Sequence, residues 1–120
     1  MSTPALIVVA LIAILHLYIA WFEMFAWVSR GPKVFKDFPK DLFEPTKALA
    51  ANQGLYNAFL AAGLIWSLFI QDPVWQPHIA TCFLLFVAVA GLYGAATASK
   101  RILYVQTVPA VIGLLLIYAL

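Results

Sequence analysis

The sequence predicts an all-α protein, built as a four-transmembrane-helix bundle. Its 120 residues are 65% hydrophobic and only 10% charged, whereas a soluble domain is about half apolar and about a quarter charged. The apolar residues fall into four runs of roughly 20, and a helix of that length crosses a hydrocarbon core of about 30 Å. The chain is therefore interpreted as a single integral membrane domain over residues 1–120, with the lipid bilayer as its partner.

The first predicted helix covers about residues 4–28. Thr3 can cap this helix, and Pro4 suits its first turn, where a missing N–H costs nothing. A cleaved signal peptide is the alternative interpretation. It fits poorly because no basic residue precedes the apolar run, and because the run is too long and contains His16 and Glu23. A retained transmembrane helix is therefore favoured.

Residues 29–45 interrupt the apolar pattern and are predicted to form a cytoplasmic loop. They contain three prolines, a glycine and interspersed basic and acidic residues. Phe35, Phe38 and Leu42 recur at helical spacing, which is typical of a short amphipathic segment on a membrane surface. An ordinary solvated loop explains the same composition, so both interpretations stay open.

Three further helices are predicted over about residues 46–70, 78–98 and 102–120. Basic residues flank the first and third connections between the four helices, whereas the second connection has none. By the positive-inside rule, the first and third connections lie in the cytoplasm and both termini lie on the extracytoplasmic side. The basic residues are Arg30, Lys33, Lys36, Lys40, Lys47, Lys100 and Arg101.

Polar residues within the predicted helices gather in their cytoplasmic halves. His16 and Glu23 are seven residues apart, so at about 100° per residue they share one face within about 20°. At about 1.5 Å per residue, Asn52 is expected level with Glu23, and Asn57 level with His16. A cytoplasm-facing polar cavity is predicted from this distribution. Its predicted ligand-binding residues are His16, Glu23, Asn52, Gln53, Tyr56, Asn57, Tyr93 and Gln106.

Each predicted site residue also has a structural interpretation. Asn and Gln in membrane helices often only bond neighbouring helices, at about 0.6 kcal/mol each, and the tyrosines suit packing or the interface. His16 can be a satisfied packing residue. Glu23 is the strongest candidate because a charge near the bilayer centre costs about 2.5 to 3.5 kcal/mol on insertion scales. It could instead reach the cytoplasmic surface or pair with Lys47.

Metal and cofactor chemistry is not predicted. The sequence lacks the His, Cys and Glu spacings that are typical of metal sites, and Cys82 alone implies neither a disulfide nor a metal. The basic residues are explained by topology, so a nucleic-acid partner is not predicted either. Pro109 is expected to remove one helical hydrogen bond and to leave the carbonyl of Val105 available beside Gln106.

Distinctive motifs occur in all four predicted helices. They are His16-Leu17-Tyr18-Ile19, Glu23-Met24-Phe25-Ala26-Trp27, Asn52-Gln53-Gly54-Leu55-Tyr56-Asn57, residues 59–66, Ala90-Gly91-Leu92-Tyr93-Gly94-Ala95 and residues 106–110. In these motifs the chain resembles the domain-of-unknown-function 1304 family of small integral membrane proteins of bacteria, over nearly its whole length. It departs mildly at Ala58, where glycine is more frequent. The resemblance implies four membrane helices in the bacterial inner (cytoplasmic) membrane, and it brings no established activity.

The function predicted from the residues is binding or proton-coupled transport of a small solute, with Glu23 and His16 as the ionisable groups. Four short helices rarely enclose a full pathway, so a homo-oligomer, in the simplest case a dimer, is expected. One alternative is a membrane-embedded enzyme that acts on a lipid or quinone-like substrate, with His16 and Glu23 as acid and base. Another is a structural or regulatory membrane subunit. A non-enzymatic role is favoured.

Overall fold

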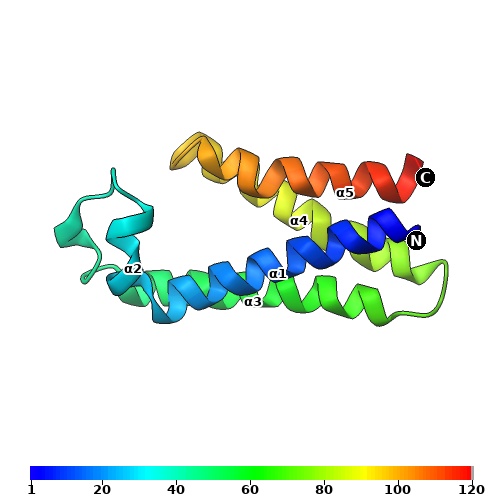
Figure 1. Cartoon of the computed structure of the whole chain (residues 1–120), viewed down its shortest axis with the longest axis horizontal. Coiled ribbons are helices and arrows are strands. Elements are labelled where there is room, and N and C mark those ends of the chain that lie inside the picture. The colour runs from blue at the N-terminus through cyan, green and yellow to red at the C-terminus, as the bar shows by residue number, and fades with distance from the viewer. Residues whose placement is uncertain (120) are drawn as a thin grey trace. The chain divides into compact units, whose positions relative to one another are not determined.

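The computed structural model describes residues 1–119, and all of their regular structure is helical. The predicted all-α class is therefore confirmed. Figure 1 shows the order of the elements along the chain. They are α1 (Thr3–Phe25), α2 (Trp27–Val34), the 3-10 turn η1 (Lys40–Leu42), α3 (Lys47–Phe69), α4 (Trp75–Thr97), the π turn η2 (Leu103–Thr107) and α5 (Val108–Ala119).

Two of these helices, α1 and α4, are long and apolar enough to cross a membrane, and each has 23 residues. Helix α3 also has 23 residues, but its N-terminal half carries Asn52, Gln53 and Asn57, which lower its hydropathy. The apolar stretch Leu103–Ala119 is shorter than these helices. The described residues thus contain two long apolar candidate spans.

The first helix ends earlier than the sequence suggests. Helix α1 stops at Phe25, Ala26 takes φ −127° and ψ 14°, and α2 then begins at Trp27. Helix α2 therefore occupies the start of the segment that was expected to be a loop. The helical spacing of Phe35, Phe38 and Leu42 does not correspond to a helix, because the first two lie between α2 and η1.

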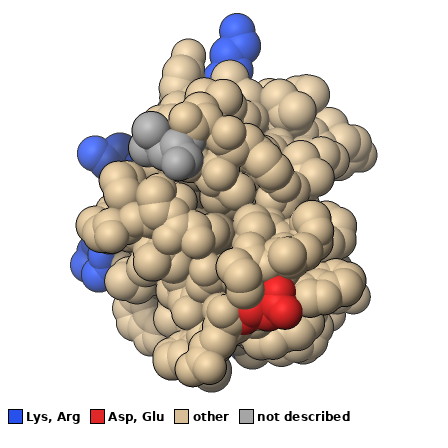
Figure 2. Space-filling model, turned by 90° about the vertical axis from the view of Figure 1, so that its right-hand side faces the viewer, with Lys and Arg blue, Asp and Glu red and all other residues tan. Residues whose placement is uncertain are grey.

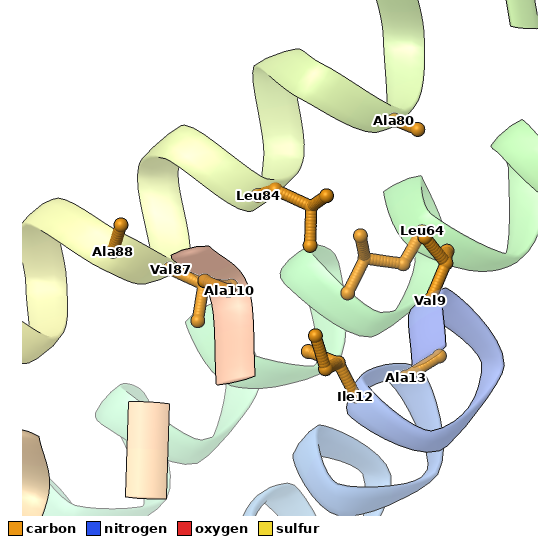
Figure 3. Packing of buried hydrophobic residues seen from close by; sticks show 9 residues of the cluster. All are labelled: Val9, Ile12, Ala13, Leu64, Ala80, Leu84, Val87, Ala88 and Ala110. Carbon is orange, nitrogen blue, oxygen red and sulfur yellow. The ribbon is translucent and has the colours of Figure 1, made fainter. Parts of the chain in front are cut away.

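The chain divides into two compact units, one made of residues 14–59 and one made of residues 1–13 and 60–120. In the second unit, buried side chains from α1, α3, α4 and α5 form one apolar core, which Figure 3 shows from close by. Several of its members are alanines, and such small side chains let helices approach closely. The core residues are Val9, Ile12, Ala13, Leu64, Ala80, Leu84, Val87, Ala88 and Ala110.

Within this second unit, the turn η2 packs closely against α4. The amide of Val108 donates to the carbonyl of Leu103, five residues earlier. A widened turn suits this position because the ring of Pro109, which has no N–H, would clash with the carbonyl four residues before it. The hydroxyl of Thr107 donates to the carbonyl of Ala88 over 2.9 Å. A Cβ at Gly91 would overlap Thr107 Oγ1 and lie 2.8 Å from its backbone nitrogen, so only glycine fits there without a shift.

In the unit of residues 14–59, an aromatic cluster holds the segment between α1 and α3 in place. Its members are Phe22, Trp27, Phe35, Phe38 and Phe43. The rings of Trp27 and Phe43 have centroids 5.0 Å apart, and Trp27 Nε1 donates to Thr46 Oγ1 over 3.0 Å. Phe43 is only 1% exposed. This segment therefore has a small aromatic core of its own, although most of its other side chains are exposed.

Large apolar side chains are exposed along all four of the longer helices. Examples are Ile14 at 61% on α1, Phe69 at 78% on α3, Val89 at 61% on α4 and Leu115 at 60% on α5. Figure 2 shows one face of the molecule, which is formed mainly by uncharged residues, with one acidic group in red and basic side chains in blue at its edges. Monomeric soluble proteins rarely expose large contiguous apolar surfaces, so this composition suits a lipid environment.

Candidate functional site

A carboxylate–amide pair joins α1 and α3 within residues 14–59. Asn57 Nδ2 donates to Glu23 Oε1 over 2.7 Å, and it also lies 3.3 Å from the carbonyl oxygen of Gln53. Asn57 is 7% exposed and Glu23 is half-buried. The distance lies within the ordinary range of N–H···O hydrogen bonds. Among residues 1–119, no Lys or Arg forms an ion pair with Glu23.

Gly54 sets the separation of the two helices at this pair. A Cβ on Gly54 would lie 2.7 Å from Met24 Cγ and 3.0 Å from both the carbonyl oxygen of Ala20 and Glu23 Cβ. Helix α3 can therefore approach α1 only because residue 54 has no side chain. Asn57 follows three residues later, on the same face of α3. Gly54 is thus the positioning residue of the pair, a role that the sequence analysis did not assign to it.

His16 is fully buried on the same stripe of α1 as Glu23. Its side chain is 0% exposed, and every buried side-chain nitrogen or oxygen within residues 1–119 has a hydrogen-bond partner. The imidazole is therefore satisfied inside the protein. Two helical turns, about 10 Å, separate the two residues along α1. This environment matches the structural interpretation of His16.

The other polar residues at the start of α3 lie on its exposed surface. Asn52, Gln53 and Tyr56 are all exposed, and the ring of Tyr56 stacks edge-on against Phe59 with centroids 6.1 Å apart. The spacing of these residues suggested one contiguous polar patch. In the structure Asn57 turns toward α1, while the other three side chains lie on the outer surface of α3.

Two predicted site residues belong to the other unit, that of residues 1–13 and 60–120. Tyr93 on α4 is 72% exposed, and Gln106 is half-buried within η2. Among the eight predicted residues, a hydrogen bond of the structure joins Glu23 with Asn57. The sequence predicts that Asn52 lies level with Glu23, but in the structure Asn57 is the residue that binds the Glu23 carboxylate.

The structure also bears on the alternative partner of Glu23. Lys47 Nζ lies 2.8 Å from Glu44 Oε1, and both side chains are exposed. Lys47 is therefore engaged by Glu44 and not by Glu23. Within residues 1–119, no three His, Cys, Asp or Glu side chains gather closely enough to hold a metal ion. The chemistry of this site is thus that of one carboxylate and one amide, which can accept a proton or bind a hydrogen-bonding or cationic group.

The fold and the carboxylate–amide pair define a small all-helical protein with long apolar helices of the kind that cross membranes. Residues 10–118 match the model of the DUF1304 family, which is described as a protein of unknown function, and the chain belongs to this family. It is 29% identical over 117 residues to the uncharacterized protein YpaA of Lactococcus lactis subsp. lactis (strain IL1403), covering 96% of this chain and 97% of the relative. No solved structure matches the chain. The family resemblance of the sequence is thereby confirmed.

Proposed function

We propose that the chain is a multi-pass protein of the bacterial inner membrane, which it crosses four times with both termini outside. Support comes from the lengths of α1, α3 and α4, 23 residues each, since about 20 apolar residues span the hydrocarbon core. The exposed apolar side chains on these helices suit contact with lipid. Helix α5, together with η2, forms the fourth crossing.

The proposed orientation rests on the distribution of charge. The connection between α3 and α4 contains Asp72 and no Lys or Arg. In contrast, most of the basic residues lie between the end of α1 and the first residue of α3, namely Arg30, Lys33, Lys36, Lys40 and Lys47. Because loops rich in Lys and Arg remain in the cytoplasm, the segment between α1 and α3 is assigned to that side. The two termini then lie outside.

The proposed activity is binding of a small cationic solute at Glu23, in exchange for a proton. The observation that carries it is the part-buried hydrogen bond of 2.7 Å between Glu23 and Asn57, which joins α1 to α3. A carboxylate in a membrane segment is expensive for packing alone. Asn57 holds Oε1 and fixes the rotamer, while Oε2 can bind the solute or a proton. Competition of the two for one carboxylate couples their movements.

A second copy of the chain is part of this proposal. Asn52 and Gln53 on α3 and Tyr93 on α4 are exposed polar side chains. Four helices of this length enclose a pathway more readily when two copies of the chain associate. The enzymatic alternative is less favoured, because an acid–base pair requires His16 to reach a substrate, and this side chain is 0% exposed.

The test is solute flux in proteoliposomes that carry the purified protein. Tetraphenylphosphonium and choline serve as cationic probes, and a pH-sensitive dye inside the vesicles reports protons. With an outward-directed proton gradient, wild-type protein is expected to accumulate at least one probe inside the vesicles. Glu23→Gln is expected to lose this uptake while remaining folded. The matched control is Glu44→Gln, which removes a carboxylate of equal charge from the exposed pair with Lys47.

Two outcomes contradict the proposal. Unchanged uptake in Glu23→Gln would remove the carboxylate from the coupling step. Absence of uptake of either probe by the wild type, combined with a large loss of stability in Glu23→Gln, would assign the Glu23–Asn57 pair to helix packing in a structural or regulatory subunit.

A further inference from the structure

We propose that Arg30 binds the phosphate group of an anionic phospholipid in the cytoplasmic leaflet. Arg30 belongs to α2 but reaches back to α1, where Nη2 donates to the hydroxyl of Tyr18 over 3.3 Å. Its guanidinium carbon lies 5.9 Å from the ring centroid of Trp21. Tyr18 and Trp21 are 43% and 46% exposed. A cation is thus held on an aromatic surface that remains open.

The fold places the guanidinium there. The break at Ala26 lets α2 change direction, and the hydrogen bond from Trp27 to Thr46 fixes the start of α2. Gly31, the next residue after Arg30, is buried under the ring of Phe43, which a Cβ at this position would overlap. One side of α2 is therefore anchored in the aromatic cluster, and Arg30 projects from it toward α1.

The guanidinium retains the capacity to bind an anion. Among residues 1–119, Arg30 forms no ion pair with an acidic side chain, and its hydrogen bond to Tyr18 uses Nη2. A guanidinium carries several N–H donors in a planar fork, which matches two oxygens of a phosphate group. The cation–π contact involves the face of the Trp21 ring and leaves other N–H donors of the exposed Arg30 accessible. The guanidinium therefore favours a ligand with paired anionic oxygens, such as a phosphate ester, over an apolar ligand.

The surroundings favour a lipid as the source of the phosphate. Arg30 follows the end of α1 at Phe25, so in the proposed threading its backbone lies at the cytoplasmic interface, beside the lipid headgroups. Tyr18 lies three residues before Trp21 on α1, deeper in the proposed threading, and both side chains are partly exposed, so an acyl chain can pass beside the two rings. Lys33 and Lys36 are exposed nearby in the sequence and favour an anionic headgroup. This inference rests on the membrane threading proposed above.

The experiment measures lipid binding to the full chain by native mass spectrometry. The detergent-solubilised protein is titrated with phosphatidylglycerol, and with phosphatidylcholine for comparison. We expect one phosphatidylglycerol per wild-type chain to bind most tightly, and about tenfold weaker binding to Arg30→Gln, because the paired donors are lost. Arg30→Lys keeps the charge without the fork and is expected to be intermediate. Lys100→Gln, which removes an exposed basic residue of the other unit, is the control and is expected to bind as the wild type does.

Three results would overturn the proposal. Equal binding by Arg30→Gln would exclude the guanidinium. An equal loss in Lys100→Gln would indicate nonspecific attraction to surface charge. Displacement of the lipid by millimolar inorganic phosphate would assign the site to a soluble anion. The proposed solute site is tested separately, because Glu23→Gln is expected to retain phosphatidylglycerol binding and Arg30→Gln to retain solute uptake.

Discussion

Replacement of Gly54 by alanine tests whether the close approach of α1 and α3 holds the Glu23–Asn57 pair. The added Cβ would lie 2.7 Å from Met24 Cγ and 3.0 Å from the carbonyl oxygen of Ala20. The side chain of Met24 can move aside, but the carbonyl belongs to the backbone of α1. The two helices must therefore separate by several tenths of an ångström, which stretches the 2.7 Å bond of the pair.

The expected loss of stability follows from three contributions. Overpacking costs about 1–3 kcal/mol, and alanine regains up to about 1 kcal/mol of helix propensity relative to glycine. Interhelical hydrogen bonds in membrane proteins contribute about 0.6 kcal/mol on average and at most about 1.7 kcal/mol. The gain in helix propensity and the weakened hydrogen bond are of similar size and opposite sign, so Gly54→Ala is expected to lower the free energy of unfolding by about 1–3 kcal/mol. Asn57→Ala is expected to lower it by about 0.6–1.7 kcal/mol.

The assay is unfolding by dodecyl sulfate in mixed micelles, followed by the fluorescence of the four tryptophans. Wild type, Gly54→Ala, Asn57→Ala and the double variant form a cycle. Because both changes act on one bond, the double variant should lose at least about 0.5 kcal/mol less than the sum of the two. Gly94→Ala is the control, since the three atoms nearest to its Cβ would all belong to the side chain of Ile102, the nearest at 3.0 Å. Additive effects, or a Gly54→Ala variant as stable as wild type, would refute the reasoning.

Two further variants test other contacts of the fold. Gly91→Ala is expected to lower the free energy of unfolding by about 1–3 kcal/mol, because its Cβ would overlap Thr107; in the same titration, a neutral effect would argue against the packing of η2 on α4. Trp27→Phe keeps a ring in the aromatic cluster but removes the donor to Thr46, so a loss of about 1 kcal/mol is expected. Faster hydrogen exchange of the α2 amides would report this loss, with the exposed Trp75→Phe as control; identical exchange in both variants would count against it.

Apolar run length carried most of the fold prediction. The sequence predicts helices over about residues 46–70 and 78–98, and α3 and α4 cover Lys47–Phe69 and Trp75–Thr97. Run length works here because charged residues flank both helices, Lys47 and Asp72 around α3, and Asp72 and Lys100 around α4. The Asp72-Pro73 turn is one example: Asp72 Oδ1 accepts from the amides of Val74 and Trp75 at the start of α4.

The break at Ala26 could not be predicted in the same way. Alanine is the best helix former, and no proline or glycine stands before residue 31 in this part of the chain. The break is associated with the contact of Trp27 with Phe43, sixteen positions later, and with its hydrogen bond to Thr46. Such long-range packing overrides local preference, and single-sequence periodicity does not contain it.

The division of the polar patch on α3 follows from helix geometry. Five residues separate Asn52 from Asn57, which at about 100° per residue is an angular difference of about 140°. The two amides therefore cannot both face α1. Which of them does so is decided by Gly54, whose missing side chain marks the face that packs. In the sequence, Gly54 between Asn52 and Asn57 is the feature that indicates the packed face of α3. It can be interpreted only once α1 is known to be the neighbouring helix.

The register of the pair has a consequence for the proposed transport role. Counting the rise along straight helices places Glu23 level with Asn52, yet its carboxylate binds Asn57, five residues deeper along α3. Side chains of a helix lean toward its N-terminus, so the carboxylate of Glu23 lies nearer the middle of α1 than its Cα does. In the proposed threading, this moves the charge away from the cytoplasmic headgroups and toward the bilayer centre. The cost of an ionised carboxylate rises with that depth, and binding of a cation or a proton is the most direct way to offset it.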